Sequence, residues 1–197
     1  MPRPARPLVD HGCYHIIARG NNRQWLFTTP AAFRQFLQLI TVAKTRYPAQ
    51  LYHYCLMSNH IHLLLEIAVG TQLPTFMQAV LHGFSRWYRH RQPYVGHVWQ
   101  GRYKSPLVAR ESYYLEAGRY IERNPLRAGL VQELRAYPWS SYASYAHGAR
   151  DPLVDEDPYY ARLGRTPSER QAAYRTFIDQ ESPYAPLLDE ELLERPF

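Results

Sequence analysis

The chain has 197 residues, of which 46% are hydrophobic and 20% charged, so a disordered chain is excluded and one domain with an extension is the expected size class. Lys and Arg outnumber Asp and Glu by 23 to 17, and nearly all of the basic residues are arginine. No apolar run reaches the ~18 residues of a membrane-spanning helix, and the N-terminus lacks the apolar segment of a signal peptide, so we expect a cytoplasmic protein with no membrane partner.

Hydrophobic periodicity and turn signals predict alternating strands and helices over the first two thirds of the chain. Strands are expected at 13–18, 50–57 and 61–67, with two more near 97–100 and 105–110. Helices are expected at 30–47, 73–91 and about 111–123. The resulting order β-α-β-β-α-β-α predicts an α+β fold of ferredoxin-like or RRM-like type, in which helices back an antiparallel sheet.

The C-terminal quarter of the chain differs from the rest in pattern and in charge. Residues 1–150 hold 18 Lys and Arg against 6 Asp and Glu, whereas residues 151–197 hold 5 against 11. In this second part, only residues 168–179 carry a helical pattern. We therefore predict one domain over 1–145 and an acidic, partly helical C-terminal extension over 146–197. The extension lies across the basic surface, stays solvated, or packs through its aromatic residues.

Tyrosine accompanies the arginine, with 17 residues in the chain. Arginine makes bidentate contacts to phosphates, and both arginine and aromatic rings stack on unpaired bases. This combination favours single-stranded nucleic acid as the partner. A genome rich in arginine codons is the alternative source of the same bias.

The sequence His60-Ile61-His62 opens the third expected strand. Alternate residues of a strand face the same side, so His60 and His62 point one way and Ile61 points into a core. Two imidazoles roughly 7 Å apart on one face are able to hold a divalent cation such as manganese, zinc or, with oxygen ligands, magnesium. The alternative is two surface histidines on a half-exposed strand.

Tyr120 and Asn124 lie four residues apart near the end of the helix expected at 111–123, so they share one helical face. A tyrosine phenol is able to attack a phosphodiester and retain its energy in a phosphotyrosine bond, provided that a metal or a base lies nearby. The alternative is an ordinary interfacial tyrosine followed by an Asn-Pro helix end.

Three motifs follow one another along the chain: Ser-Asn-His-Ile-His at 58–62, Trp-Gln-Gly-Arg-Tyr at 99–103 and Tyr-Ile-Glu-Arg-Asn-Pro at 120–125. In this order they resemble the HUH single-tyrosine transposases, and in particular the REP-associated tyrosine transposases related to insertion-sequence enzymes. The turn at 19–23 and Trp-Ser-Ser-Tyr at 139–142 fit the same branch. The resemblance covers about residues 8–145.

The resemblance implies a metal-dependent transposase, which nicks and ligates single-stranded hairpin DNA of REP type through a 5′-phosphotyrosine intermediate. It implies Tyr120 as the nucleophile and His60 and His62 as ligands of Mg²⁺ or Mn²⁺. Asn124 stands where insertion-sequence relatives often have a glutamine ligand, and it is the expected further ligand. Tyr113 and Tyr114 are rival nucleophiles, but neither has an amide four residues later.

Two other functions stay open on the same residues. A protein of this fold that has lost catalysis would only bind single-stranded nucleic acid, and a metal-dependent phosphodiesterase would use water in place of tyrosine. A covalent protein–DNA adduct distinguishes the transposase from both. We expect no small-molecule substrate, a monomer or homodimer, and association with the nucleoid when DNA is bound.

Basic and aromatic clusters outside the catalytic positions are expected to hold the DNA strand. We assign DNA contacts to Arg19, Asn21, Asn22, Arg23, Arg86, Arg89, Trp99, Arg102, Tyr103 and Lys104. Solvated turns and helix faces are the alternative for these clusters. His15 and His53 are interpreted as structural residues, and Trp139 and Tyr142 as packing residues.

Overall fold

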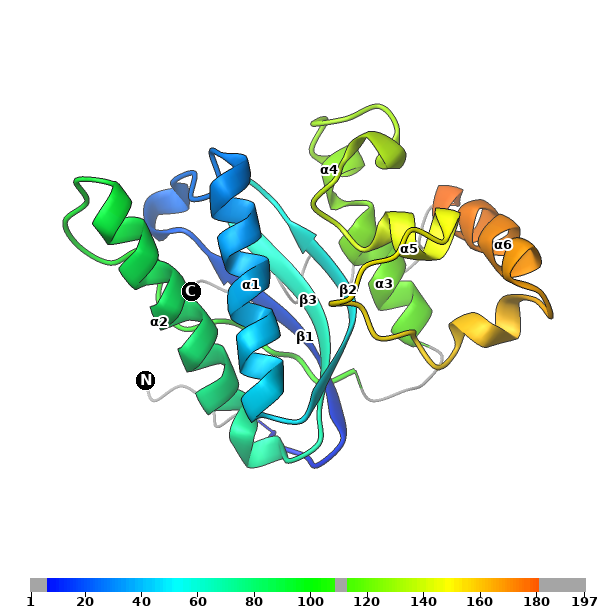
Figure 1. Cartoon of the computed structure of the whole chain (residues 1–197), viewed down its shortest axis with the longest axis horizontal. Helices are drawn as coiled ribbons and strands as arrows, with labels where there is room; N and C mark the ends of the chain where they lie inside the picture. The colour runs from blue at the N-terminus through cyan, green and yellow to red at the C-terminus, as the bar shows by residue number, and fades with distance from the viewer. Residues whose placement is uncertain (1–6, 109–112, 181–197) are drawn as a thin grey trace.

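The computed structural model describes residues 7–108 and 113–180. Its centre is an antiparallel sheet of three strands, β1 (Gly12–Arg19), β2 (Ala49–Leu56) and β3 (His60–Ile67), in the order β1-β3-β2. Figure 1 shows this sheet with helices on both sides. The expected α+β fold, in which helices back an antiparallel sheet, is confirmed.

The first helical layer consists of α1 (Pro30–Arg46) and α2 (Leu73–Arg91), which lie side by side across one face of the sheet (Figure 1). Both match the helices expected from the sequence. Thr29 caps α1 by accepting a hydrogen bond from the backbone of Ala32, and proline occupies the first turn, where no donor is needed. The main core between this layer and the sheet contains the aromatic side chains Tyr14, Phe27, Phe33, Phe36, Phe76 and Phe84.

The second layer begins with α3 (Tyr114–Glu122), which packs on the opposite face of the sheet. Its close approach depends on Gly118, because a Cβ at this position would lie 2.6 Å from the ring of His53 on β2. One further turn, α4 (Asn124–Arg127), follows directly. The described helix begins at Tyr114, and residue 111, where the sequence predicts its start, lies outside the described residues.

The two weaker strands expected near 97–100 and 105–110 are a wrong prediction over the described part of this segment. The segment runs along the outer edge of β1, where isolated bridges pair Trp99 with Gly20, Lys104 with Ile17 and Leu107 with Tyr14. A continuous ladder does not form, because Gly101 turns the chain with a φ of 77° and Pro106 has no N–H to donate. Residues 109 and 110 lie outside the described residues.

The described part of the acidic extension packs against the second layer. Helices α5 (Tyr142–His147) and α6 (Pro167–Asp179) contact each other, and a third core gathers around Tyr145 and Tyr174. The acidic end at 181–197 lies outside the described residues, and the division of the chain into a domain and an extension stays a prediction. None of the described helices has the length and apolar character needed to cross a bilayer.

Candidate active site

His60 and His62 share one face of β3, as their spacing predicts. This is the face that α3 covers. In the sheet register, His62 lies between Ile17 of β1 and Cys55 of β2, and His60 lies opposite Arg19. The ring centroids of His60 and His62 are 5.0 Å apart, and the rings are nearly perpendicular at 78°. The two imidazoles therefore converge near the beginning of β3.

Helix α3 brings Tyr120 to these histidines. The ring centroids of Tyr120 and His62 are 5.9 Å apart, and the rings meet edge to face. Arg127 of α4 lies over the Tyr120 ring, with its guanidinium carbon 5.0 Å from the centroid. Only 2% of Tyr120 is exposed. The structure thus gathers two histidines and a tyrosine that the sequence places on separate elements.

Asn124 begins α4, one turn beyond Tyr120. Its amide nitrogen donates to the backbone carbonyls of Tyr120 and Ile121, at 2.8 and 3.3 Å. These bonds hold the amide in one orientation, and the ligand atom that it offers to a cation is its oxygen. Metal ligation by Asn124 stays a prediction.

A third histidine joins this group. The Nε2 atom of His15, on β1, lies 2.9 Å from Nδ1 of His62, and the His15 ring meets that of Tyr120 edge on, 5.6 Å between centroids. We call His15, His60 and His62 the histidine cluster. The sequence indicates only a histidine in an apolar strand, so His15 was interpreted as structural. The pairing of β1 with β3 is what brings it to His62.

Burial keeps the histidine cluster neutral. Desolvation lowers the pKa of His15 to about 3, and desolvation with the positive charge of Arg19 lowers the pKa of His60 to about 4. Desolvation also holds the pKa of His62 well below its ordinary value, and the neighbouring His60 and His15 act in the same direction. Neutral imidazole is the form that binds a metal ion.

A divalent cation fits these residues in donor chemistry. Over residues 7–108 and 113–180, no group of three or more His, Cys, Asp or Glu side chains is arranged to hold a metal ion. However, the buried Nε2 of His62 has no hydrogen-bond partner in the described structure, as expected of a nitrogen reserved for a ligand. Two imidazoles with an amide oxygen suit manganese better than magnesium, which prefers oxygen ligands throughout.

His53, on the same sheet face, has a different environment. It lies between two buried carboxylates, with Nδ1 2.9 Å from Glu122 and Nε2 3.2 Å from Asp157. Desolvation opposes the charged ring, but the hydrogen bonds to Asp157 and Glu122 outweigh it and raise the pKa of His53 to about 9. Tyr174 and Ser141 also donate to Glu122. These five residues form the His53 network, which agrees with the structural role expected for His53.

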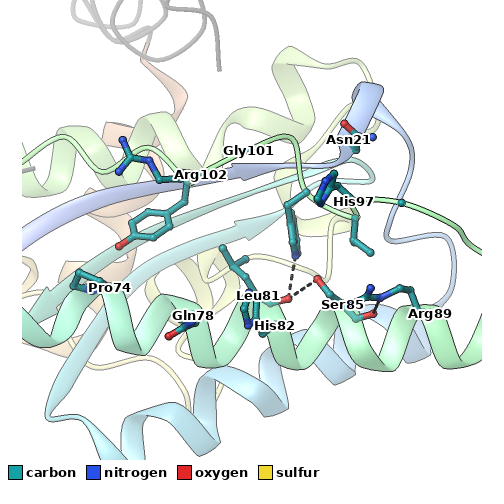
Figure 2. Close-up of a pocket in the computed structure, with 14 residues that line it drawn as sticks. Asn21, Pro74, Gln78, Leu81, His82, Ser85, Arg89, His97, Gly101 and Arg102 are labelled. Carbon is teal, nitrogen blue, oxygen red and sulfur yellow. Dashed lines mark hydrogen bonds between the residues drawn. The ribbon is translucent and has the colours of Figure 1, made fainter. Parts of the chain in front are cut away.

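A cleft of about 720 Å³ opens between α2 and the segment at 96–103 (Figure 2). Residues expected to bind DNA line it, namely Asn21, Arg89, Trp99, Arg102 and Tyr103. The Trp99 indole donates to the backbone carbonyl of Leu81 on α2, at 3.1 Å, and this bond holds the two walls together. The cleft therefore combines guanidinium groups with the half-buried ring of Trp99. Tyr103 is only 8% exposed and packs in the main core, so base stacking by its ring is a wrong prediction.

The turn after β1 connects this cleft with the histidine cluster. Arg19 ends β1 opposite His60, and Asn22 and Arg23 follow with φ angles of 50° and 55°. The turn is fixed to the strand pair, because the side chain of Asn59 donates to the backbone carbonyl of Arg23. Of the four residues of this turn that are expected to bind DNA, Asn21 lines the cleft and Arg19 lies opposite His60, so the turn joins the cleft to the catalytic face.

Arg86 and Lys104 lie apart from that turn. Arg86 and Arg89 line a second cleft, of about 670 Å³, which α2 shares with α1. Lys104 pairs through its backbone with Ile17 of β1. The residues expected to bind DNA therefore occupy the β1 edge and two clefts along α2, and their contacts with DNA stay a prediction.

Trp25 is a residue that the sequence predictions overlooked. Its side chain is 69% exposed, whereas Leu26 and Phe27 are buried and their backbones donate to the carbonyl of Ser58. An exposed indole on an anchored turn, two residues after Arg23, has the chemistry to stack on an unpaired base. The signal in the sequence was a lone tryptophan directly after a basic turn.

Comparison with known proteins points to one family. The family model described as "Transposase IS200 like" matches residues 9–124. A solved REP-associated tyrosine transposase, bound to a REP hairpin, aligns with 80% of this chain and 93% of its own at a TM-score of 0.65 and 18% identity, which shows a shared fold. A transposase candidate from Deinococcus radiodurans R1 aligns with 68% and 97% at a TM-score of 0.43 and 20% identity. No curated protein matches the chain.

Proposed function

Because the chain belongs to the IS200-like transposase family, we propose that it cleaves and rejoins single-stranded DNA with Tyr120 as the nucleophile. The observation that carries this proposal is the meeting of His60, His62 and Tyr120 on one face of the sheet. One chain supplies all three side chains, so we expect a monomer to hold a complete site.

The proposed reaction is a transesterification. The Oη of Tyr120 gives up its proton and attacks the phosphorus in line to form a 5′-phosphotyrosine bond, while the bond from phosphorus to the 3′-oxygen breaks. The departing oxygen takes up one proton, which balances the one that Tyr120 loses. The number of phosphodiester bonds is unchanged, so a 3′-OH can attack the phosphotyrosine and rejoin a strand without ATP. A site that excludes water would protect this intermediate from hydrolysis, and Tyr120 is almost completely buried in the free protein.

His60 and His62 would hold the divalent cation, Mg²⁺ or Mn²⁺, with Asn124 as a further ligand. When bound, the cation supplies positive charge that polarises a non-bridging phosphate oxygen and stabilises the departing 3′-oxygen. The guanidinium of Arg127, over the Tyr120 ring, adds positive charge beside the attacking phenolate.

We propose a hairpin of single-stranded DNA, of REP type, as the substrate. The REP-associated transposase of the same fold is bound to a REP hairpin. In this chain, Arg89 and Arg102 line the cleft along α2 and suit phosphates. The half-buried Trp99 is the ring there that suits an unpaired base, because Tyr103 is only 8% exposed. Binding should weaken as salt rises, because phosphate contacts release counterions. If the protein bound a random duplex as tightly as the hairpin, the proposed hairpin substrate would be wrong.

A labelled single-stranded hairpin, incubated with the protein and Mn²⁺ and separated on a denaturing gel, tests this function. We expect a covalent adduct from the wild type and none from Tyr120→Phe, which removes the hydroxyl but keeps the packed ring. Tyr114→Phe, on the same helix, is the matched control and should form the adduct.

Three other results would overturn parts of the proposal. An adduct that mass spectrometry assigns to Tyr113 or Tyr114 would replace the nucleophile. Metal-dependent cleavage without an adduct would favour a phosphodiesterase that uses water. Hairpin binding without cleavage would favour a binding protein that has lost catalysis.

A further inference from the structure

Asn59 holds His60 in one tautomer. The Nδ1 atom of His60 lies 2.6 Å from Oδ1 of Asn59, and the Asn59 amide nitrogen donates to the backbone carbonyl of Arg23 at 3.2 Å. The second bond fixes which end of the amide is oxygen, and an amide oxygen only accepts. His60 therefore carries its proton on Nδ1, and its lone pair is on Nε2.

His62 has one ring nitrogen bonded and one without a partner. Its Nδ1 pairs with Nε2 of His15, whereas its own Nε2 and the Nδ1 of His15 are buried and have no hydrogen-bond partner among the described residues. If His62 donates from Nδ1, the buried N–H at Nδ1 of His15 stays unsatisfied. If His15 donates from Nε2, the buried N–H at Nε2 of His62 stays unsatisfied. A cation at Nε2 of His62 is compatible with only one of the two arrangements, that in which His62 donates from Nδ1.

The sheet register explains why His15 has this position. The residue directly opposite His62 on β1 is Ile17, which offers no polar side-chain atom. His15 is opposite Leu64, one step further along the same face, so it is the diagonal neighbour of His62. From there its ring reaches both His62 and Tyr120.

We propose that Asn59 and His15 are positioning residues that set the tautomers of His60 and His62, so that both histidines present the Nε2 lone pair to one divalent cation. Asn59 accepts the proton of His60 Nδ1 through its amide oxygen. His15 accepts the proton of His62 Nδ1 through its Nε2 and keeps its own proton on Nδ1. The inference rests on the proposed function, because it concerns the cation site of that reaction.

Nitrogen-15 NMR of the metal-free, full-length protein reads these tautomers directly, through couplings between ring nitrogens and carbon-bound protons. We expect the proton of both His60 and His62 on Nδ1. A proton on Nε2 of either residue would overturn the proposal. This readout needs neither DNA nor metal, and it needs no variant to fold.

Calorimetric titration with Mn²⁺ then tests whether the two positioning residues act on the cation. His15→Leu and Asn59→Leu remove the acceptor with little change of volume, and we expect each to weaken Mn²⁺ binding about 10- to 100-fold. His15→Gln and Asn59→Asp keep an oxygen acceptor and should recover most of the affinity. Leucine variants that fold and bind Mn²⁺ as the wild type does would overturn the proposal.

The same samples separate this inference from the proposed function. A wild type with the expected tautomers and Mn²⁺ affinity that forms no DNA adduct would support the positioning and refute the cleavage. A wild type that forms the adduct with His62 protonated on Nε2 would support the cleavage and refute the positioning.

Discussion

His15 and His53 lie on either side of Leu64 in the sheet, on the same face and almost completely buried. The ring of His15 has one hydrogen bond, between its Nε2 and the neutral ring of His62, and its Nδ1 has no partner among the described residues. His53 has both nitrogens bonded to the carboxylates of Glu122 and Asp157. His15 and His53 are therefore equally buried, but the hydrogen-bond partners of their rings differ. A neutral, incompletely bonded cluster is suited to a ligand, whereas a charged, fully bonded network is suited to holding elements together.

Helix α3 contacts both environments. It carries Tyr120 to the histidine cluster and Glu122 to the His53 network, two residues later on the same helix. Tyr174 of α6 donates to Glu122 at 2.8 Å, so the network also ties the acidic extension to α3. The network therefore stabilises the helix that carries the proposed nucleophile, and the comparison predicts separable losses of chemistry and of stability.

The largest expected effect is the loss of DNA-adduct formation in a variant of His62. His62→Ala should lower the rate of adduct formation about 10³-fold or more, because a cation ligand is lost. The free energy of unfolding should fall by about 2–3 kcal/mol, because removal of this buried ring leaves a cavity and breaks its hydrogen bond with His15. Adduct gels and urea unfolding measure the two quantities. Wild-type cleavage by this variant would refute the ligand assignment.

His53→Ala should show the reverse pattern. We expect the free energy of unfolding to fall by about 3–5 kcal/mol, because two buried carboxylates lose their cationic partner. Urea unfolding of His11→Ala is the matched control, since the exposed pair of His11 with Glu66 should contribute less than about 1 kcal/mol. A similar small loss in both variants would show that the network is not stabilising.

The pH dependence of stability tests the charge on His53. Because the folded pKa of about 9 lies above the ordinary 6.5, the stabilisation by His53 is fully present below pH 6.5 and is lost as pH rises through 9. Urea midpoints should therefore fall across this window. In Asp157→Asn the decline should be smaller and should end at a lower pH, because one carboxylate that favours the charged ring is gone and the folded pKa of His53 falls toward 6.5. A wild-type profile without this decline would contradict a protonated His53.

The smallest expected effect is that of Tyr174→Phe. This change removes the hydroxyl that donates to Glu122 and keeps the ring against Tyr145, so we expect a loss of about 1–2 kcal/mol in the free energy of unfolding. Adduct formation by the folded variant should match the wild type. If Tyr174→Phe slowed adduct formation as much as His62→Ala does, the His53 network would take part in catalysis.

The elements that the sequence predicts best are those with strong local patterns. The helices Pro30–Arg46 and Leu73–Arg91 match their predicted ranges within one residue, because apolar stripes and a Thr-Pro start are local signals. The segment at 97–108 has an apolar pattern that predicts strands, yet it forms isolated bridges. A pattern of side chains does not report whether the backbone can complete a ladder, and the turn at Gly101 with the proline at 106 prevents it here.

The sequence by itself determined that His60 and His62 share one face of a strand, and that Tyr120 and Asn124 share one face of a helix, because both relations follow from backbone periodicity. Only the tertiary structure decided that these two faces meet, and that His15 joins them whereas His53 does not. In the sequence both histidines stand in apolar strands. The strand order β1-β3-β2 separates them, since it sets His15 beside His62 and leaves His53 to Glu122 of α3 and Asp157 of the extension. Such long-range pairing depends on the packing of whole elements, which no local pattern specifies.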